Sequence, residues 1–210
     1  MAKPQLDYTL YLVTDRDLMS ADSLEQAVDR ACAGGATLVQ LREKHAGHDE
    51  LLELAGRVKQ VTDAHGVGLI VNDDARVAAE VRAAGVHVGQ GDMPLPEVRA
   101  IVGDDAVIGV SASNLAQALA AQQGGADYLG IGAMTYTPTK PDAQVTSRDE
   151  LGRILDAVDI PCVVIGGIGE ASIPSYASFA KLAGYAVVSA IMAADDIAAA
   201  ASRLHKLIGR

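Results

Sequence analysis

A short segment around residue 40 carries an amide and two cations at alternating positions. Gln40, Arg42 and Lys44 are separated by Leu41 and Glu43, and a period of two places the first three on one side of an extended chain. An arginine fork and a lysine point charge both suit a phosphate or diphosphate. The pattern therefore predicts a phosphate site, with an alternative in which the segment is a surface strand end that forms ion pairs with Glu43.

Two carboxylates follow neighbouring segments that are predicted to be β-strands, and they could converge on one cation. Asp73 and Asp92 each come shortly after such a segment, and oxygen ligands of this kind favour Mg²⁺. The alternative is that Asp73, like its neighbours Asn72 and Asp74, caps a following helix.

The segment 133–147 is long and rich in Pro and Thr, which is typical of an active-site loop. Within it, the hydroxyls and the lysine of Thr135–Lys140 could close on a phosphate, but the Gly-Lys pair of a Walker A loop is absent. Gly166–Gly169 and the pair Val188–Ser189 could bind phosphate through backbone N–H groups. For the glycines, a turn without a ligand is the alternative.

No sequence pattern indicates a zinc site or a nucleophile. Cys32 and Cys162 are far apart, with neither a Cys-x-x-Cys nor a His-Glu-x-x-His motif in the chain. We interpret both as small buried hydrophobic residues of a reducing compartment. His87 alternates with apolar neighbours, which favours a core or supporting imidazole over a catalytic one.

The elements that must position these residues alternate regularly along the chain. The predicted strands are 9–13, 36–41, 68–71, 86–88, 107–110, 128–131, 162–165 and 186–188. The predicted helices are 23–33, 49–64, 75–84, 94–102, 115–123, 148–158, 173–182 and 195–207. Eight β-α units are typical of a (β/α)₈ TIM barrel, whereas a doubly wound sheet usually has fewer strands. We therefore predict an α/β fold with one TIM-barrel domain over residues 1–210.

In a TIM barrel the reactive groups gather where the strands end. Polar or glycine residues follow all eight predicted strands. They include Thr14 and Asp15 after the first strand, Ser111 at the end of the fifth and Ser189 after the eighth. The polar segments described above would therefore meet at one end of the barrel.

Composition excludes several classes of partner. The chain has 27 acidic and 17 basic side chains and a formal charge of −10, which argues against binding to nucleic acid or to anionic membranes. With no apolar leader and no long apolar stretch, we expect a cytoplasmic protein. Ala-rich helices could pack against a second subunit or within the outer ring, so a homo-oligomer stays open.

The sequence resembles the thiamine phosphate synthase family over nearly its whole length. The motifs that carry the resemblance are Val39-Gln40-Leu41-Arg42-Glu43-Lys44, Asn72-Asp73, His87-Val88-Gly89-Gln90 with Asp92, and Thr137-Pro138-Thr139-Lys140. Each motif is short, and it is their order and spacing together that make the resemblance specific.

The resemblance implies an enzyme that joins hydroxymethylpyrimidine diphosphate to thiazole phosphate, releasing diphosphate with the help of Mg²⁺. Arg42, Lys44, Lys140 and Ser111 would be its catalytic residues, and Asp73 and Asp92 would carry the metal. The implied contacts to the two small-molecule substrates are Gln40, Leu41, Arg42, Glu43, Lys44, Asn72, Ser111, Thr137, Pro138, Thr139, Lys140, Gly167, Val188 and Ser189.

The chain departs from the family pattern before the Thr-Lys motif. Members usually read Gly-Pro-(Val/Ile)-Phe-Pro-Thr there, whereas this sequence reads Gly132-Ala133-Met134-Thr135-Tyr136-Thr137. The change falls near the expected thiazole site and leaves the predicted diphosphate and metal residues in place.

Two other functions are compatible with a phosphate-binding barrel. One is a TenI-like thiazole tautomerase, a relative that generally lacks the complete diphosphate and metal set. The other is a noncatalytic barrel that binds a phosphate ligand. The presence of both the acidic pair and the basic residues favours the synthase, because a binder needs no separate provision for a leaving group.

Overall fold

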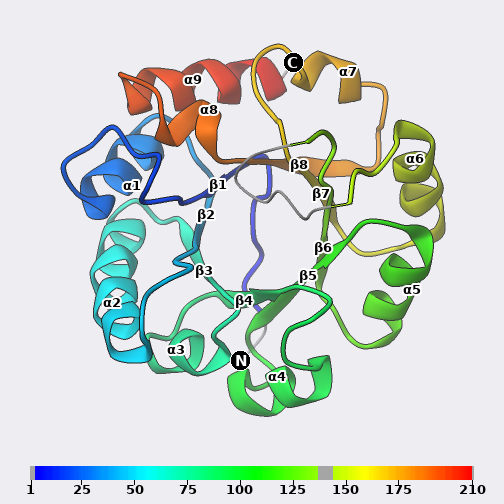
Figure 1. The fold of residues 1–210 in the computed structure, drawn as a ribbon, viewed down its shortest axis with the longest axis horizontal. Helices are drawn as coiled ribbons and strands as arrows, with labels where there is room; N and C mark the ends of the chain where they lie inside the picture. Colours follow the sequence, from blue (N-terminus) through cyan, green and yellow to red (C-terminus); the bar gives the residue numbers. More distant parts are fainter. Residues whose placement is uncertain (1–2, 137–143, 210) are drawn as a thin grey trace.

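The computed structural model describes residues 3–136 and 144–209. Its strands pair in parallel and in chain order, and β8 pairs with β1, so the sheet closes into a barrel (Figure 1). The strands are β1 (Leu10–Val13), β2 (Leu38–Leu41), β3 (Gly68–Asn72), β4 (Gly85–Val88), β5 (Val107–Ala112), β6 (Tyr128–Ile131), β7 (Cys162–Ile165) and β8 (Leu182–Val187). The predicted α/β TIM barrel is therefore confirmed.

Helices surround the barrel on its outer side (Figure 1). They are α1 (Leu24–Ala33), α2 (His48–Ala64), α3 (Ala75–Glu80), α4 (Leu95–Val102), α5 (Leu115–Gln123), α6 (Arg148–Ala157), α7 (Ile173–Tyr176), α8 (Ser189–Met192) and α9 (Ile197–Ile208). Side chains of Ser23, Asn114 and Ser147 cap α1, α5 and α6 by accepting backbone N–H groups. Within the described ranges, no helix is both long and apolar enough to cross a membrane.

Alternating side chains divide the core into an inner and an outer layer. Inside the barrel, Tyr11, Leu38, Ile70, Tyr128 and Val163 pack together. The intervening strand residues point outward and pack against the helices, as the two-residue period requires. Both cysteines are buried and free, and burial raises the pKa of each thiol to about 12.

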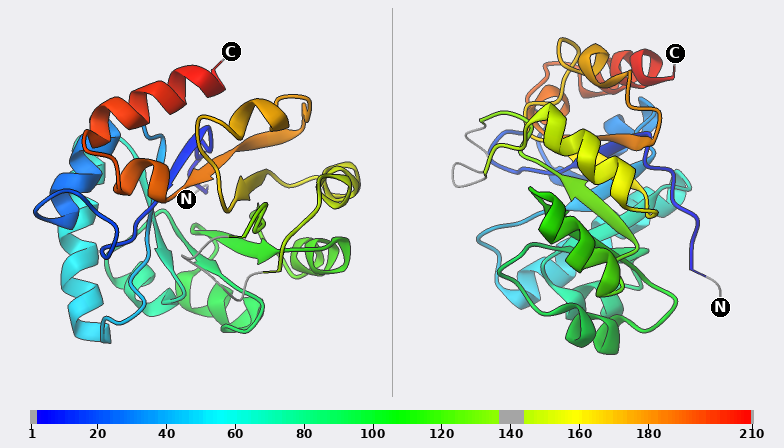
Figure 2. Two further views of the ribbon diagram at one scale, coloured as in Figure 1. Left: turned by 45° about the horizontal axis from the view of Figure 1, so that its top comes forward. Right: turned by 90° about the vertical axis from the view of Figure 1, so that its right-hand side faces the viewer.

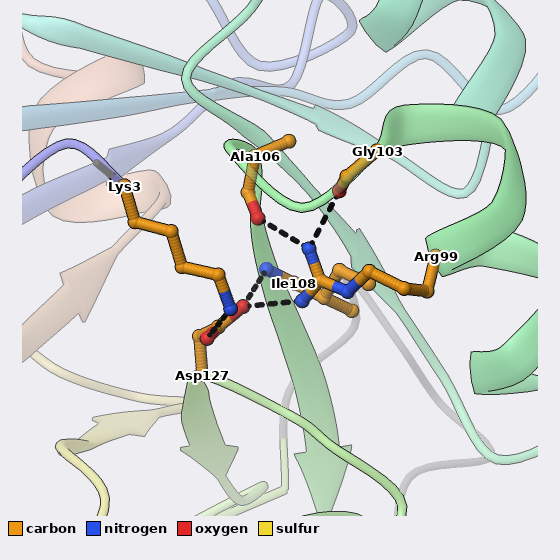
Figure 3. Close-up of polar contacts among 6 residues, drawn as sticks. All are labelled: Lys3, Arg99, Gly103, Ala106, Ile108 and Asp127. Carbon is orange, nitrogen blue, oxygen red and sulfur yellow. Dashed lines mark hydrogen bonds and ion pairs between the residues drawn. The ribbon is translucent and has the colours of Figure 1, made fainter. Parts of the chain in front are cut away.

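The N-terminal segment, residues 3–9, lies across the end of the barrel at which the strands begin (Figures 1 and 2). Leu6 and Tyr8 pack on the inner layer, and the rings of Tyr8 and Tyr128 lie 4.9 Å apart. Lys3 donates to the Asp127 carboxylate beneath β6 (Figure 3). The segment therefore covers the apolar interior at the end opposite to the expected site.

The predicted boundaries fail between β7 and β8. A single helix was predicted over 173–182, but α7 ends at Tyr176 and β8 already begins at Leu182. Residues 182–187 pair with β7 on one side and β1 on the other, so this strand is set by tertiary pairing that a local sequence pattern does not show. The short helix α8 was also not predicted.

Candidate active site

A cavity opens at the end of the barrel where the strands run into the following loops. With its open mouth included, the hollow spans about 990 Å³. Its concave position at the carboxyl ends of the strands is where barrels bind small molecules. Its lining comprises Tyr11, Val13, Gln40, Arg42, Asn72, His87, Ser111, Gly130, Gly132, Ala133, Val163, Ile165, Gly166, Gly167, Ile168, Ala186, Val188 and Ser189. Polar groups come from six of the strands or their ends, while the remaining wall is apolar or glycine.

The end of β2 supplies an amide and a guanidinium, as the alternating pattern predicts. Leu38 packs in the inner layer, and Gln40 and Arg42 follow it along the cavity wall. The Arg42 backbone N–H donates to Thr14 Oγ1 at 3.0 Å, which joins the end of β2 to that of β1. Lys44 lies beyond the strand, in an adjoining hollow that Arg42 also lines. The structure thus places both cations at the mouth.

Two other members of this motif, Leu41 and Glu43, do not line the main cavity, and their roles as substrate contacts stay predictions. The Leu41 side chain is fully buried in the outer layer. Glu43 forms an ion pair with Arg16, with Nε and Oε2 3.1 Å apart. Burial raises the pKa of Glu43 although Arg16 opposes the shift. Its carboxylate therefore links two mouth loops.

The two aspartates at the end of β3 differ in role: Asp74 caps a helix, whereas Asp73 stays a candidate metal ligand. The Asp74 carboxylate accepts the N–H groups of Arg76 and Val77, both at 2.9 Å, and thus caps α3. Asp73 instead has a left-handed backbone with φ 64°, a conformation that is uncommon outside glycine. Its N–H donates to the His87 carbonyl at 2.8 Å, so the residue continues the pairing of β3 with β4. The capping alternative therefore applies to Asp74 and not to Asp73.

Asp92 lies in the loop after β4, next to the end of β3. Its Oδ2 accepts the Gly89 N–H at 2.6 Å, and a Cβ at position 89 would lie 2.9 Å from the same oxygen. Asp73 and Asp92 thus follow paired neighbouring strands. Two exposed carboxylates fit Mg²⁺, which usually takes one or two from the protein and completes its shell with water and substrate phosphate. No cluster of three or more His, Cys, Asp or Glu positioned for a metal occurs among residues 3–136 and 144–209.

Ser111, near the end of β5, is held at both its side chain and its backbone. His87 Nε2 and Ser111 Oγ are 2.9 Å apart, and the Gln90 amide donates to the Ser111 carbonyl at 2.7 Å. His87 is largely buried, as predicted, but it also lines the cavity. Sequence reasoning missed Tyr11 as a cavity residue, although its two-residue spacing from Val13 could have indicated an inward side chain.

The glycines after β7 adjoin the loop that follows β6. Gly166 and Gly167 have φ values of 96° and 71°, and a Cβ at position 167 would overlap the Thr135 methyl group. Glycine is therefore required there by both backbone conformation and packing. The loop is tied back by Met134, whose N–H donates to the Ile165 carbonyl at 2.9 Å. Thr137, Pro138, Thr139 and Lys140 lie outside the described residues.

The last expected contacts, Val188 and Ser189, line the cavity between β8 and α8. Together with Gly167, they form the wall opposite the β3 and β4 ends in strand order. Of the expected site residues that the structure describes, it brings Gln40, Arg42, Asn72, Ser111, Gly167, Val188 and Ser189 together around one cavity.

Comparison with known proteins agrees with this arrangement. Residues 10–191 match the family described as Thiamine monophosphate synthase. A thiamine-phosphate synthase of Clostridium beijerinckii is 50% identical over 202 residues, covering 96% of both chains. One of Chloroflexus aurantiacus is 47% identical over 204 residues, covering 97% of this chain and 94% of the relative.

A solved structure gives the same result in three dimensions. The thiamine phosphate pyrophosphorylase of Pyrococcus furiosus superimposes with a TM-score of 0.88 at 35% identity, covering 97% of this chain and 96% of that one. The sequence identity to these relatives over nearly the full length is higher than a shared barrel fold alone would give. The chain therefore belongs to the thiamine monophosphate synthase family.

Proposed function

We propose that this protein condenses hydroxymethylpyrimidine diphosphate with thiazole phosphate to give thiamine phosphate and diphosphate. The observation that carries the proposal is the gathering of Gln40, Arg42, Asn72 and Ser111 around one cavity. Gln40, Arg42 and Asn72 belong to the motifs through which the chain resembles the family, and Ser111 is a substrate contact that the resemblance implies. The near full-length identity to curated thiamine-phosphate synthases supports the same reaction.

The reaction exchanges one bond to carbon for another. The bond between the pyrimidine methylene carbon and a diphosphate oxygen breaks, and its electron pair leaves with the diphosphate. The amino group of the pyrimidine stabilises the resulting cation, and the thiazole nitrogen then forms the new C–N bond. No protein nucleophile and no proton transfer to the nitrogen is required, so the site must supply charge stabilisation and orientation.

Cations at the cavity mouth suit the leaving diphosphate. Arg42 offers a rigid set of donors and Lys44 a point charge, and Ser111 and Asn72 offer shorter-range donors from the wall. From the motif, Lys140 would add a third cation. Charge that grows on the leaving group would meet preorganised partners, which is the main way such a site lowers a barrier.

Mg²⁺ is the cofactor that the acidic residues suit. We propose that Asp73 and Asp92 hold it beside the diphosphate, because both follow neighbouring strands and both are oxygen ligands. When bound, Mg²⁺ would neutralise part of the leaving-group charge. The left-handed backbone of Asp73 supports a functional role, since such conformations persist where the surroundings impose them.

The opposite wall suits the phosphate of the thiazole. Gly167 and the Val188–Ser189 backbone would bind it through N–H groups, and Thr137, Pro138 and Thr139 would complete the site. The site must also exclude water, which could otherwise capture the pyrimidine cation.

We also propose that residues 1–210 form one domain. The first and last strands pair with each other, and α1 packs beside α9. Both ends of the chain therefore depend on the same barrel.

The decisive experiment mixes the purified protein with both substrates and Mg²⁺ and measures diphosphate and thiamine phosphate in parallel. Equal amounts of both products are expected. Omission of the thiazole phosphate tests whether diphosphate release is coupled to condensation. A tautomerase would isomerise its thiazole substrate without releasing diphosphate, and a noncatalytic binder would form neither product. Either result would overturn the proposal.

A further inference from the structure

Five side chains form a continuous hydrogen-bonded chain across the floor of the cavity. The Gln40 amide nitrogen donates to the Tyr11 hydroxyl at 2.8 Å, and the Tyr11 and Tyr128 hydroxyls are 2.8 Å apart. The Tyr128 hydroxyl lies 2.9 Å from His87 Nδ1, and His87 Nε2 lies 2.9 Å from Ser111 Oγ. The chain thus joins residues of β1, β2, β4, β5 and β6 and ends on the proposed catalytic serine.

Small residues on the neighbouring strands make room for this arrangement. A Cβ at Gly109 would overlap the Tyr128 ring, and a Cβ at Gly130 would lie 3.1 Å from His87 Cε1. Tyr11 and Tyr128 are 1% and 0% exposed. The positions of the rings are therefore set by close packing as well as by hydrogen bonds.

The order of donors and acceptors determines where each proton lies. Burial raises the pKa of both tyrosines, so each keeps its single hydroxyl proton. The Tyr11 oxygen already accepts from Gln40, and the other hydrogen-bond partner of this hydroxyl in the described part of the chain is Tyr128. Tyr11 therefore donates to Tyr128, because otherwise its buried proton would have no acceptor.

The same reasoning continues to the histidine. The Gln40 amide also lies beside the Tyr128 hydroxyl and acts on it as a donor, because it lowers the pKa of Tyr128. Since Tyr128 accepts from Tyr11, its own proton goes to His87 Nδ1. The imidazole then carries its proton on Nε2 and donates it to Ser111 Oγ. The serine oxygen is thus occupied as an acceptor, and the serine proton is directed to another group.

We propose that Tyr11, Tyr128 and His87 are positioning residues that hold Ser111 as a hydrogen-bond donor to the leaving diphosphate. Ser111 lies on the cavity wall, where its O–H can point to an anion. A neutral His87 with its proton on Nε2 leaves the serine that orientation. This inference rests on the proposed function for the identity of the anion, whereas the tautomer of His87 depends on the protein alone.

The first test needs no substrate. Long-range ¹H–¹⁵N NMR of the protein labelled at histidine distinguishes the two neutral imidazole tautomers, and loss of one set of signals in His87→Gln assigns the residue. The Nε2–H tautomer is expected for His87. A spectrum with the proton on Nδ1 would overturn the proposal, whether or not the protein forms thiamine phosphate.

The second test interrupts the series of side-chain hydrogen bonds at two separate residues. Tyr128→Phe and Tyr11→Phe each remove one hydroxyl, and kcat should fall roughly 10-fold with little change in either KM, less than for loss of a direct charge-stabilising donor. Tyr128→Phe should also weaken the preference of His87 for the Nε2–H form.

Tyr8→Phe is the matched control, because the Tyr8 ring lies beside Tyr128 while its hydroxyl is outside the chain. This variant should retain both kcat and the tautomer. Unchanged kcat in both folded chain-breaking variants, checked by circular dichroism, would show that the hydroxyls have only a structural role. If wild-type protein forms no thiamine phosphate, the proposed function fails independently of the NMR result.

Discussion

Arg99 on α4 and Asp127, directly before β6, form an ion pair at the end of the barrel where the strands begin, with Nη2 and Oδ2 2.7 Å apart (Figure 3). The Asp127 carboxylate also accepts from Lys3 and, at 2.8 Å, from the Ile108 N–H. The Arg99 guanidinium donates further to the Gly103 and Ala106 carbonyls. One carboxylate thus connects the N-terminal segment, β5 and α4 at the end of the barrel that is remote from the cavity.

Asp127→Asn should destabilise the protein by about 2 kcal/mol, because the amide has one acceptor oxygen for three donors and leaves partly buried cations without their counter-charge. Urea unfolding measures the loss. Glu170→Gln is the matched control, since its pair with Arg203 is more than half exposed and such pairs contribute at most about 1 kcal/mol. Equal stability losses in the two variants would contradict this explanation.

The Asp127 carboxylate should also make the free energy of unfolding depend on pH in the acidic range. Burial alone would raise the pKa of Asp127, but hydrogen bonds from Lys3, the Ile108 N–H and Arg99 hold it below its usual value. A carboxyl whose pKa is lower in the folded state stabilises fully above its unfolded pKa, about 3.9. The contribution is lost as pH falls through the folded pKa. The difference in unfolding free energy between wild type and Asp127→Asn should therefore narrow below about pH 4, and a difference that stays constant there would count against the assigned ion contacts.

Local sequence patterns were sufficient to predict the barrel, because eight β-branched runs and the helix caps signal their elements independently of tertiary contacts. They failed at 173–182, where the helix ends at Tyr176 and β8 begins at Leu182, because β8 is imposed by pairing with β1 and β7. They also placed Gln40 and Arg42 on the cavity wall correctly, since a two-residue period survives folding. The contact of Tyr11 with Tyr128 could not be predicted in this way, because 117 residues separate them.

Gly109→Ala should destabilise the protein by about 3 kcal/mol or prevent folding, since the added methyl group would overlap the Tyr128 ring inside the barrel. Gly56→Ala is its control. Gly56 lies within α2, where an added Cβ meets nothing within 4 Å, and alanine there should stabilise by about 0.5–1 kcal/mol. Thermal unfolding of both variants tests the pair. A neutral Gly109→Ala would mean that the ring can move away.

Lys140→Ala should slow turnover by roughly 10²-fold or more, the scale for a lost charge contact in the transition state. Steady-state kinetics with both substrates measure the effect on kcat. Lys206→Ala, an exposed substitution on α9, controls for the loss of one positive charge from the whole protein and should leave kcat unchanged. A near-normal kcat in Lys140→Ala would remove this residue from the proposed set of diphosphate contacts.

Substitution of Asp73 and Asp92 tests the proposed Mg²⁺ site separately from the basic side chains. Asp73→Ala combined with Asp92→Ala should abolish both activity and tight Mg²⁺ binding, because the two carboxylates are the protein ligands proposed for it. Mg²⁺ titration by calorimetry in the presence of diphosphate gives a readout that does not require turnover. Asp104→Ala removes an exposed carboxylate from the α4–β5 loop at the remote end of the barrel and should bind Mg²⁺ like wild type. An active double variant that works without added metal would show that Arg42, Lys44 and Lys140 neutralise the leaving group without Mg²⁺, and the shared-metal proposal would then be wrong.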